Sequence, residues 1–71
     1  MITTNKELYD FCVFSRRERG KIQDATRFRN ELGLRFYGST DPNELLERCI
    51  ERRLIKCDAG NIIIKVGSYE R

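Results

Sequence analysis

The chain of 71 residues contains no histidine, one proline and only three cysteines. Without histidine it lacks the side chain that most often acts as a general base near neutral pH. Its five glycines stand far apart, so it has no Gly-rich loop of the kind that cradles phosphates in nucleotide-binding enzymes. We therefore expect no enzymatic activity, no catalytic residue and no cofactor.

The three cysteines, Cys12, Cys49 and Cys57, are widely spaced and form no CxxC pair. An odd number at such spacing argues against a secreted disulfide framework, and the missing histidine argues further against a zinc site. All three fall at positions expected to be buried, where cysteine behaves as a small apolar residue. We expect free thiols, no bound metal and a cytoplasmic location.

The chain also lacks a long apolar run. Its start, "MITTNKELYD", is polar, and no segment approaches the roughly 18–20 apolar residues of a membrane helix. We expect neither a signal peptide nor contact with a membrane. A composition of 39% hydrophobic and 35% charged residues instead indicates one folded domain, spanning 1–71, with a highly charged surface.

Capping residues and apolar spacing predict two helices in the first half of the chain. Thr4 and Glu7 fit a capping box, which predicts a helix from about Asn5 to about Arg17. A second helix is expected within 21–33, with Gly33 capping its end and Leu34 packing just beyond it. The apolar residues that place this second helix recur at spacings of three, three and four: Ile22, Ala25, Phe28 and Leu32.

A third helix is predicted to begin after Asp41. Asp41 suits the N-cap, Pro42 the first helical position, and Glu44 completes a D-x-x-E capping box. The expected core-facing stripe of this helix comprises Leu45, Leu46, Cys49, Ile50 and Leu54.

The last apolar stretch has the period of a β-strand, and the turn 58–61 divides it into two strands of a hairpin. Pairing Cys57 with Ile62 would direct Ile55, Cys57, Ile62 and Ile64 to the core. Lys56, Ile63 and Lys65 would then point to the other side. The predicted class is α+β, with three helices followed by a C-terminal β-hairpin.

The segment "FRNELGLRFYGSTDPNELLERCIERRLIKCDAGNIIIKV" resembles the end of a winged helix-turn-helix domain. The resemblance lies in the "ELGL" that closes one helix, the run "LLERCIERRLI" into a strand, and the Gly-containing turn before "NIIIKV". It implies that the last helix enters the DNA major groove and that the hairpin, or wing, lies against the backbone or minor groove. The third helix departs from that pattern because Glu44, Glu47 and Glu51 face outward and would repel phosphate.

Positive charge is concentrated in the segment 16–35, which has seven bases and three acids. Such a cluster predicts a small basic protein that binds nucleic acid, most of all duplex DNA in transcription regulation or another DNA transaction, with RNA as a further candidate. The residues expected to contact nucleic acid are Arg16, Arg17, Arg19, Lys21, Arg27, Arg29, Arg35, Arg48, Lys56 and Lys65.

Other interpretations of the same residues stay open. Bases near the end of the first helix also complement the helix dipole, and the glutamates and arginines of the third helix could form only a solvated surface. Phe36 and Tyr37 could stack on bases or pack in the core. The alternative function is a protein-interaction module, an inhibitor or adaptor of a cellular enzyme, that uses the acidic third helix.

Overall fold

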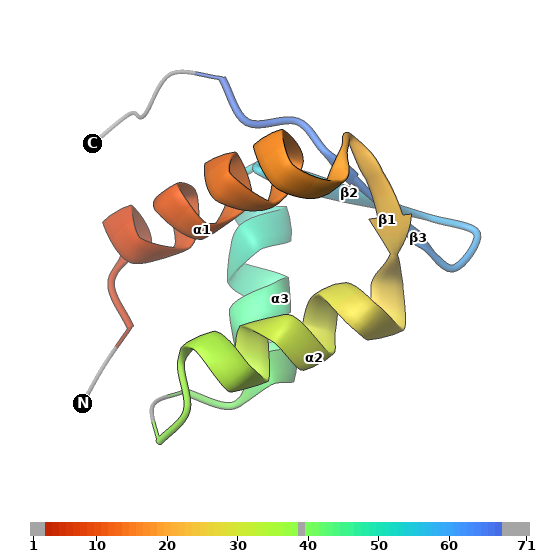
Figure 1. The fold of residues 1–71 in the computed structure, drawn as a ribbon. Helices are drawn as coiled ribbons and strands as arrows, with labels where there is room; N and C mark the ends of the chain where they lie inside the picture. Colours follow the sequence, from red (N-terminus) through yellow and green to blue (C-terminus); the bar gives the residue numbers. More distant parts are fainter. Residues whose placement is uncertain (1–2, 39, 68–71) are drawn as a thin grey trace.

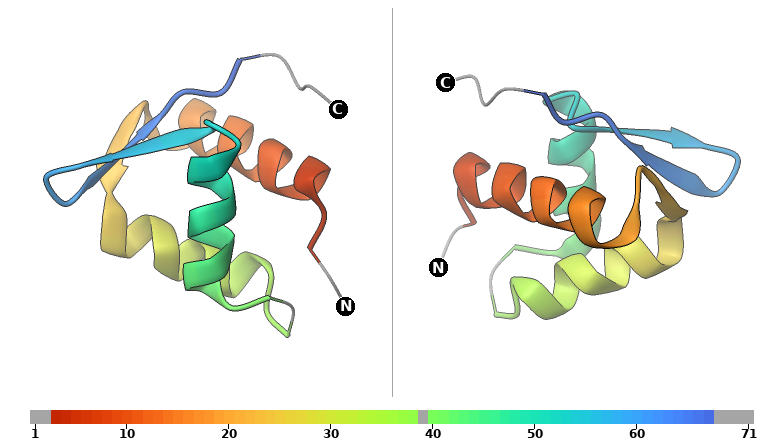
Figure 2. Two further views of the ribbon diagram at one scale, coloured as in Figure 1. Left: turned by 180° about the vertical axis from the view of Figure 1, so that it is seen from behind. Right: turned by 45° about the horizontal axis from the view of Figure 1, so that its top comes forward.

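The computed structural model describes residues 3–38 and 40–67, and this part of the chain forms three helices and a three-stranded antiparallel sheet. The α+β class is confirmed. In the view of Figure 1, α3 crosses behind α1 and α2, and the view from behind in Figure 2 shows it in front of them, with the β2–β3 hairpin projecting beyond the helices. The elements in chain order are α1 (Asn5–Arg19), β1 (Ile22–Asp24), α2 (Ala25–Arg35), α3 (Pro42–Glu51), β2 (Ile55–Asp58) and β3 (Asn61–Ile64).

The start of α1 is the predicted capping box. The Glu7 backbone N–H donates to Thr4 Oγ1 at 3.2 Å, and the Thr4 N–H donates to Glu7 Oε1 at 2.9 Å. This N–H bond from Thr4 holds the pKa of the Glu7 carboxyl below its usual value of 4.5. The helix ends at Gly20, whose φ of 99° lies in the left-handed region that favours glycine.

The predicted beginning of the second helix is wrong, because Ile22–Asp24 form the strand β1 instead. This strand pairs with β3, so the sheet order is β1-β3-β2 and the strands are more than a C-terminal hairpin. Asp24 ends the strand and caps α2, its Oδ1 accepting from the Arg27 N–H at 2.9 Å. As a consequence Ile22 faces outward and is 62% exposed, although its spacing had placed it in the core.

The predicted end of the second helix is also wrong, because α2 continues through Gly33 to Arg35. Gly33 serves packing rather than capping: a Cβ at this position would lie 3.1 Å from Cγ of Pro42, where α3 begins beside α2. Leu34, expected to pack after a cap, is 78% exposed.

Helix α3 begins as predicted, with Asp41 at the N-cap and Pro42 in the first turn, but the Asp41 side chain makes no capping hydrogen bond. The helix packs through Leu45 and Cys49, both fully buried. Ile50 follows Cys49 by one residue, a rotation of about 100° around the axis, and so it is 40% exposed rather than central to the core. Leu46 is only partly buried.

The predicted hairpin register, Cys57 opposite Ile62, is confirmed. Ile55, Ile62 and Ile64 are buried beneath the sheet. Cys57 shares their side but is exposed, because the outer part of the hairpin extends past the helices that would cover it. The prediction of a buried Cys57 is therefore wrong.

The core between the helices contains a cluster of three phenylalanines and two buried thiols. Phe28 meets Phe11 edge to face with ring centroids 5.4 Å apart, and Phe36 meets Phe11 at 5.9 Å. Cys12 and Cys49 are buried free thiols, and a hydrogen bond to Cys49 together with burial raises the pKa of Cys12. The connector after α2 thus contributes Phe36 to the core, whereas the neighbouring Tyr37 is 91% exposed.

Candidate nucleic-acid interface

Two arginines of the basic segment meet at one carboxylate. Arg19, at the end of α1, forms an ion pair with Glu31 of α2, and Arg27 Nε lies 3.4 Å from the same Glu31 oxygen. The Glu31 side chain is only 19% exposed, so this cluster fastens α1 to α2. Arg19 and Arg27 therefore have a structural role in the free protein.

Two further predicted contacts also serve the fold. Arg48 donates to the Thr3 carbonyl at 2.9 Å and to Asn5 Oδ1 at 2.6 Å. It thereby ties α3 to the start of α1. The Arg35 guanidinium stacks over the Phe36 ring at 5.2 Å from the ring centre.

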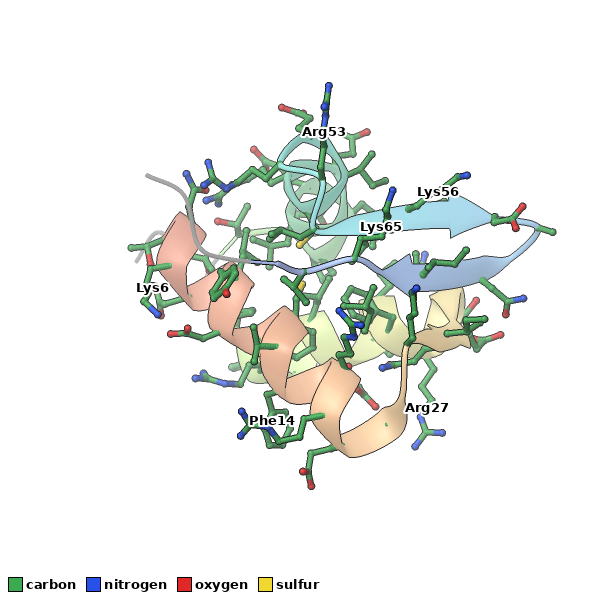
Figure 3. All side chains as sticks on the ribbon, turned by 90° about the horizontal axis from the view of Figure 1, so that it is seen from above. Lys6, Phe14, Arg27, Arg53, Lys56 and Lys65 are labelled. Carbon is green, nitrogen blue, oxygen red and sulfur yellow. The ribbon has the colours of Figure 1, made fainter. Side chains whose placement is uncertain are left out.

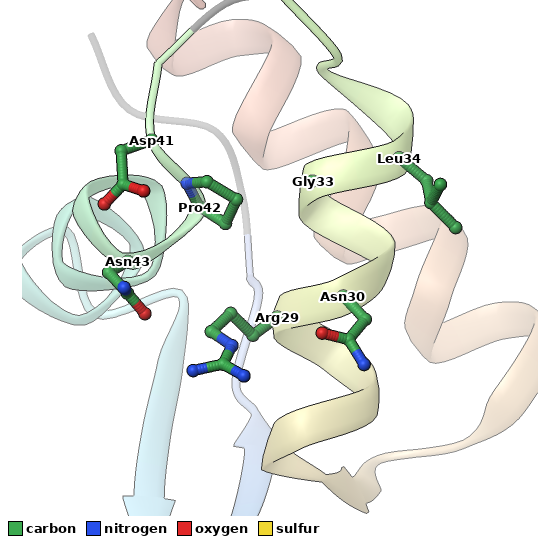
Figure 4. A pocket seen from close by; sticks show the side chains of 7 residues that line it. All are labelled: Arg29, Asn30, Gly33, Leu34, Asp41, Pro42 and Asn43. Carbon is green, nitrogen blue, oxygen red and sulfur yellow. The ribbon is translucent and has the colours of Figure 1, made fainter.

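Arg29 and Lys21 lie in different parts of the molecule. Arg29 lines a hollow of about 500 Å³ between α2 and the start of α3. Figure 4 shows its side chain extending toward the α3 side, while Leu34 points to the opposite side of α2. Lys21 lies between α1 and β1, where its carbonyl accepts from the Ile64 N–H at 2.8 Å and its side chain is exposed.

Lys56 and Lys65 share one side of the hairpin. Lys56 lies opposite Ile63, and Lys65 follows Ile63 by two residues, so the two lysines are diagonal neighbours about 7–8 Å apart at their backbone positions. Figure 3 shows both extending from the outer side of the sheet, with Arg27 lying apart from them, beyond β1. Strand alternation had predicted this placement.

Arg53 extends on the same side (Figure 3) and was not among the predicted contacts. It adopts a left-handed φ of 58° in the turn between α3 and β2. The next residue, Leu54, accepts a hydrogen bond from the Lys65 N–H at 2.7 Å, which places Arg53 beside Lys65. The sequence signal was the pair of arginines at 52–53, which is separated from β2 by one residue.

Arg16 and Arg17, near the end of α1, lie next to the chain segment that follows Lys65. Arg16 Nη1 donates to the Val66 carbonyl at 3.0 Å, one residue beyond Lys65. Arg17 lines the same shallow hollow as Arg16 and Val66. We call the resulting surface the basic face; it consists of Arg16, Arg17, Arg53, Lys56 and Lys65.

The basic face has no anionic partner among the residues that the structure describes. The acids nearest along the sheet are Asp58 and Asp24, which lie toward the hairpin turn. Positive charge is therefore concentrated at the root of the hairpin and not at its tip.

Helix α3 presents charge of the opposite sign. Glu44, Glu47 and Glu51 recur at spacings of three and four and are all exposed, so they line one side of the helix. We call them the acidic stripe. Ile50 lies beside them, three residues after Glu47.

The described residues contain no cluster of three potential metal ligands, and none of the helices that they form is long and apolar enough to cross a bilayer. Searches found no match to the chain among protein-family models, curated proteins or solved structures.

Proposed function

We propose that the chain is a small nucleic-acid-binding module that holds the phosphate backbone with its basic face, and that duplex DNA is its main ligand. The observation that carries this proposal is the group of three cations at the hairpin root, Arg53, Lys56 and Lys65, which extend together without an anionic partner in the described chain. Unpaired cations grouped on one surface are the electrostatic footprint of phosphate binding.

The arrangement of elements supports a winged-helix type for this module. A strand between the first two helices pairs with a hairpin that follows the third helix. In our proposal this hairpin takes the place of the wing in the family that the sequence resembles. In our proposal the wing root and the end of α1 contact the backbone. The acidic stripe keeps α3 from reading bases closely, because its carboxylates repel phosphates on either side of a groove. Binding should therefore depend weakly on sequence.

The test is a titration of the protein with duplex DNA, single-stranded DNA and RNA at several salt concentrations. We expect duplex binding whose log affinity falls linearly with log salt, with a slope of about −0.9 for each phosphate contact. Replacing Arg53, Lys56 and Lys65 with alanine should weaken binding on every duplex and make the slope shallower by up to about 2.7. Absence of binding to all three nucleic acids at about 50 mM salt would overturn the proposal, because screening is weak there.

A protein-docking function is the second candidate, and the acidic stripe favours it. Ile50 is 40% exposed between Glu47 and Glu51, so the outward side of α3 combines an apolar contact with negative charge. Replacing Glu47 and Glu51 with glutamine separates the two functions. The change should maintain or improve DNA affinity if the basic face binds DNA, and it should weaken the capture of a basic protein partner if α3 is the contact.

A further inference from the structure

The outer side of the sheet carries an apolar row beside its lysines. Ile22, Ile63 and Lys56 lie directly opposite one another on β1, β3 and β2, so their side chains emerge on the same side of the sheet. Ile22 is 62% exposed, and Ile63 is partly exposed. Lys65 adds a second cation next to this row. We call these four residues the outer sheet face: Ile22, Ile63, Lys56 and Lys65.

The outer sheet face and the outward side of α3 are complementary. One presents two isoleucines with two lysines, and the other presents Ile50 with the glutamates of the acidic stripe. Each surface therefore offers exposed aliphatic side chains and charges that the other can neutralise. The same molecule cannot join them over their full extent, because α3 packs beneath the sheet through Leu45 and Cys49 while its glutamates face solvent.

We propose that the acidic stripe and Ile50 of one copy dock on the outer sheet face of a second copy, so that copies associate head to tail. A contact between two different surfaces is heterologous, and it can continue from copy to copy rather than stop at a symmetric dimer. Only a few exposed side chains take part on each surface, so we expect the contact to be smaller than the standard interface of about 1,600 Å². The association is accordingly weak, dependent on concentration and sensitive to salt.

The association shares Lys56 and Lys65 with the basic face. A copy whose outer sheet face is covered by another α3 cannot offer these two lysines to phosphate. Duplex DNA and self-association therefore compete, and added DNA should dissociate the chains of copies. The docking itself does not depend on the proposed function, and it is tested without any nucleic acid.

The experiment is sedimentation velocity on the purified chain from about 10 µM to about 1 mM, the range in which weak contacts are populated. At about 50 mM salt we expect the average mass to rise above that of the monomer with concentration, and at about 1 M salt, where the Debye length is about 3 Å, we expect it to return to the monomer. A wild-type protein that stays monomeric throughout would overturn the proposal.

Charge reversal makes the test specific. The variant Glu47→Lys with Glu51→Lys and the variant Lys56→Glu with Lys65→Glu should each associate at least about tenfold more weakly than wild type, since like charges would face one another. Their equimolar mixture should associate again, because each then offers a surface that fits the other. A pair of single variants gives the matched control: Glu47→Lys should weaken association, and Glu18→Lys, the same change on the exposed side of α1, should leave association unchanged. Circular dichroism confirms that each variant folds, and failure of the mixture to associate would refute head-to-tail docking.

Discussion

The arginine-rich segment 16–35 and the root of the hairpin both carry concentrated positive charge. They differ in whether those charges are paired within the protein or extend into solvent. In the segment, Arg16 and Arg17 belong to the basic face, but Arg19 and Arg27 share Glu31, and Arg35 stacks on Phe36. At the hairpin root the cations extend together into solvent. The difference teaches that charge density along the chain does not predict charge density on the surface. A helix turns successive residues around its axis, whereas strand alternation keeps every second residue on one side.

The largest expected effect is the loss of stability on truncating Phe28, the residue through which the arginine-rich segment packs in the core. Phe28 is fully buried and holds α2 against Phe11. Phe28→Ala should lower the free energy of unfolding by about 3–5 kcal/mol, which is close to the whole stability of a domain of this size. The half-exposed Ile50 is the control, because Ile50→Ala should cost far less. Denaturant unfolding checks both, and equal costs would contradict the observed orientation of α3.

Replacing Arg48 separates a structural role from a role in DNA binding. It is a base on the helix that the family resemblance would place on DNA, but its guanidinium donates to Thr3 and Asn5. Arg48→Ala should lower the free energy of unfolding by about 1.5–3 kcal/mol, the range for hydrogen bonds to charged groups. Thermal melting measures this loss. Duplex DNA affinity measured well below the melting temperature should stay the same, and a selective loss of affinity would place Arg48 in the interface instead.

Glu31→Gln tests whether the ion pairs with Glu31 keep Arg19 and Arg27 from binding DNA. Loss of the carboxylate should cost about 0.5–1 kcal/mol, because the pairs with Arg19 and Arg27 are partly solvated. It should also release two guanidinium groups and raise the affinity for duplex DNA several-fold. Affinity and melting are measured on the same preparation. A decrease in affinity would show that Glu31 positions these arginines for DNA.

The smallest expected effect concerns α1 alone. Hydrogen bonds from Thr4 lower the pKa of Glu7, so the folded state favours the carboxylate. The resulting stability is complete above about pH 4.5 and is lost as the pH falls through the folded-state pKa. Wild type should therefore be more stable than Glu7→Gln near neutral pH, and the gap should shrink on acidification. A gap that is constant with pH would show that the Glu7 charge does not support the capping box.

Local signals in the sequence predicted much of this fold. The Thr4–Glu7 capping box, the start of α3 at Pro42 and the pairing of Cys57 with Ile62 depend on neighbouring residues or on strand alternation, and all three are present. The strand β1 could not be predicted in this way. Its three residues are extended because they pair with β3, which lies about forty positions away in the sequence.

The candidate site was predicted only where its residues depend on local sequence signals. The common side of Lys56 and Lys65 follows from strand period, which is local. The ion pair between Arg19 and Glu31 and the hydrogen bond from Arg48 to Thr3 depend on how the helices pack against one another. Residue spacing along one helix does not predict such contacts between helices. Arg53 was missed because its position depends on the left-handed turn that joins α3 to β2.

The most direct test of the basic face compares two double variants that remove equal charge. Lys56→Ala with Lys65→Ala removes two cations that are free in the described chain, and Arg19→Ala with Arg27→Ala removes the two that pair with Glu31. The measurement is the slope of log affinity for one duplex DNA against log salt. The slope should become shallower by about 1.8 for the lysine variant, two contacts at about 0.9 each, and stay near the wild-type value for the arginine variant. Equal slopes for the two variants, or a loss confined to the arginine variant, would contradict the assignment of phosphate binding to the hairpin root.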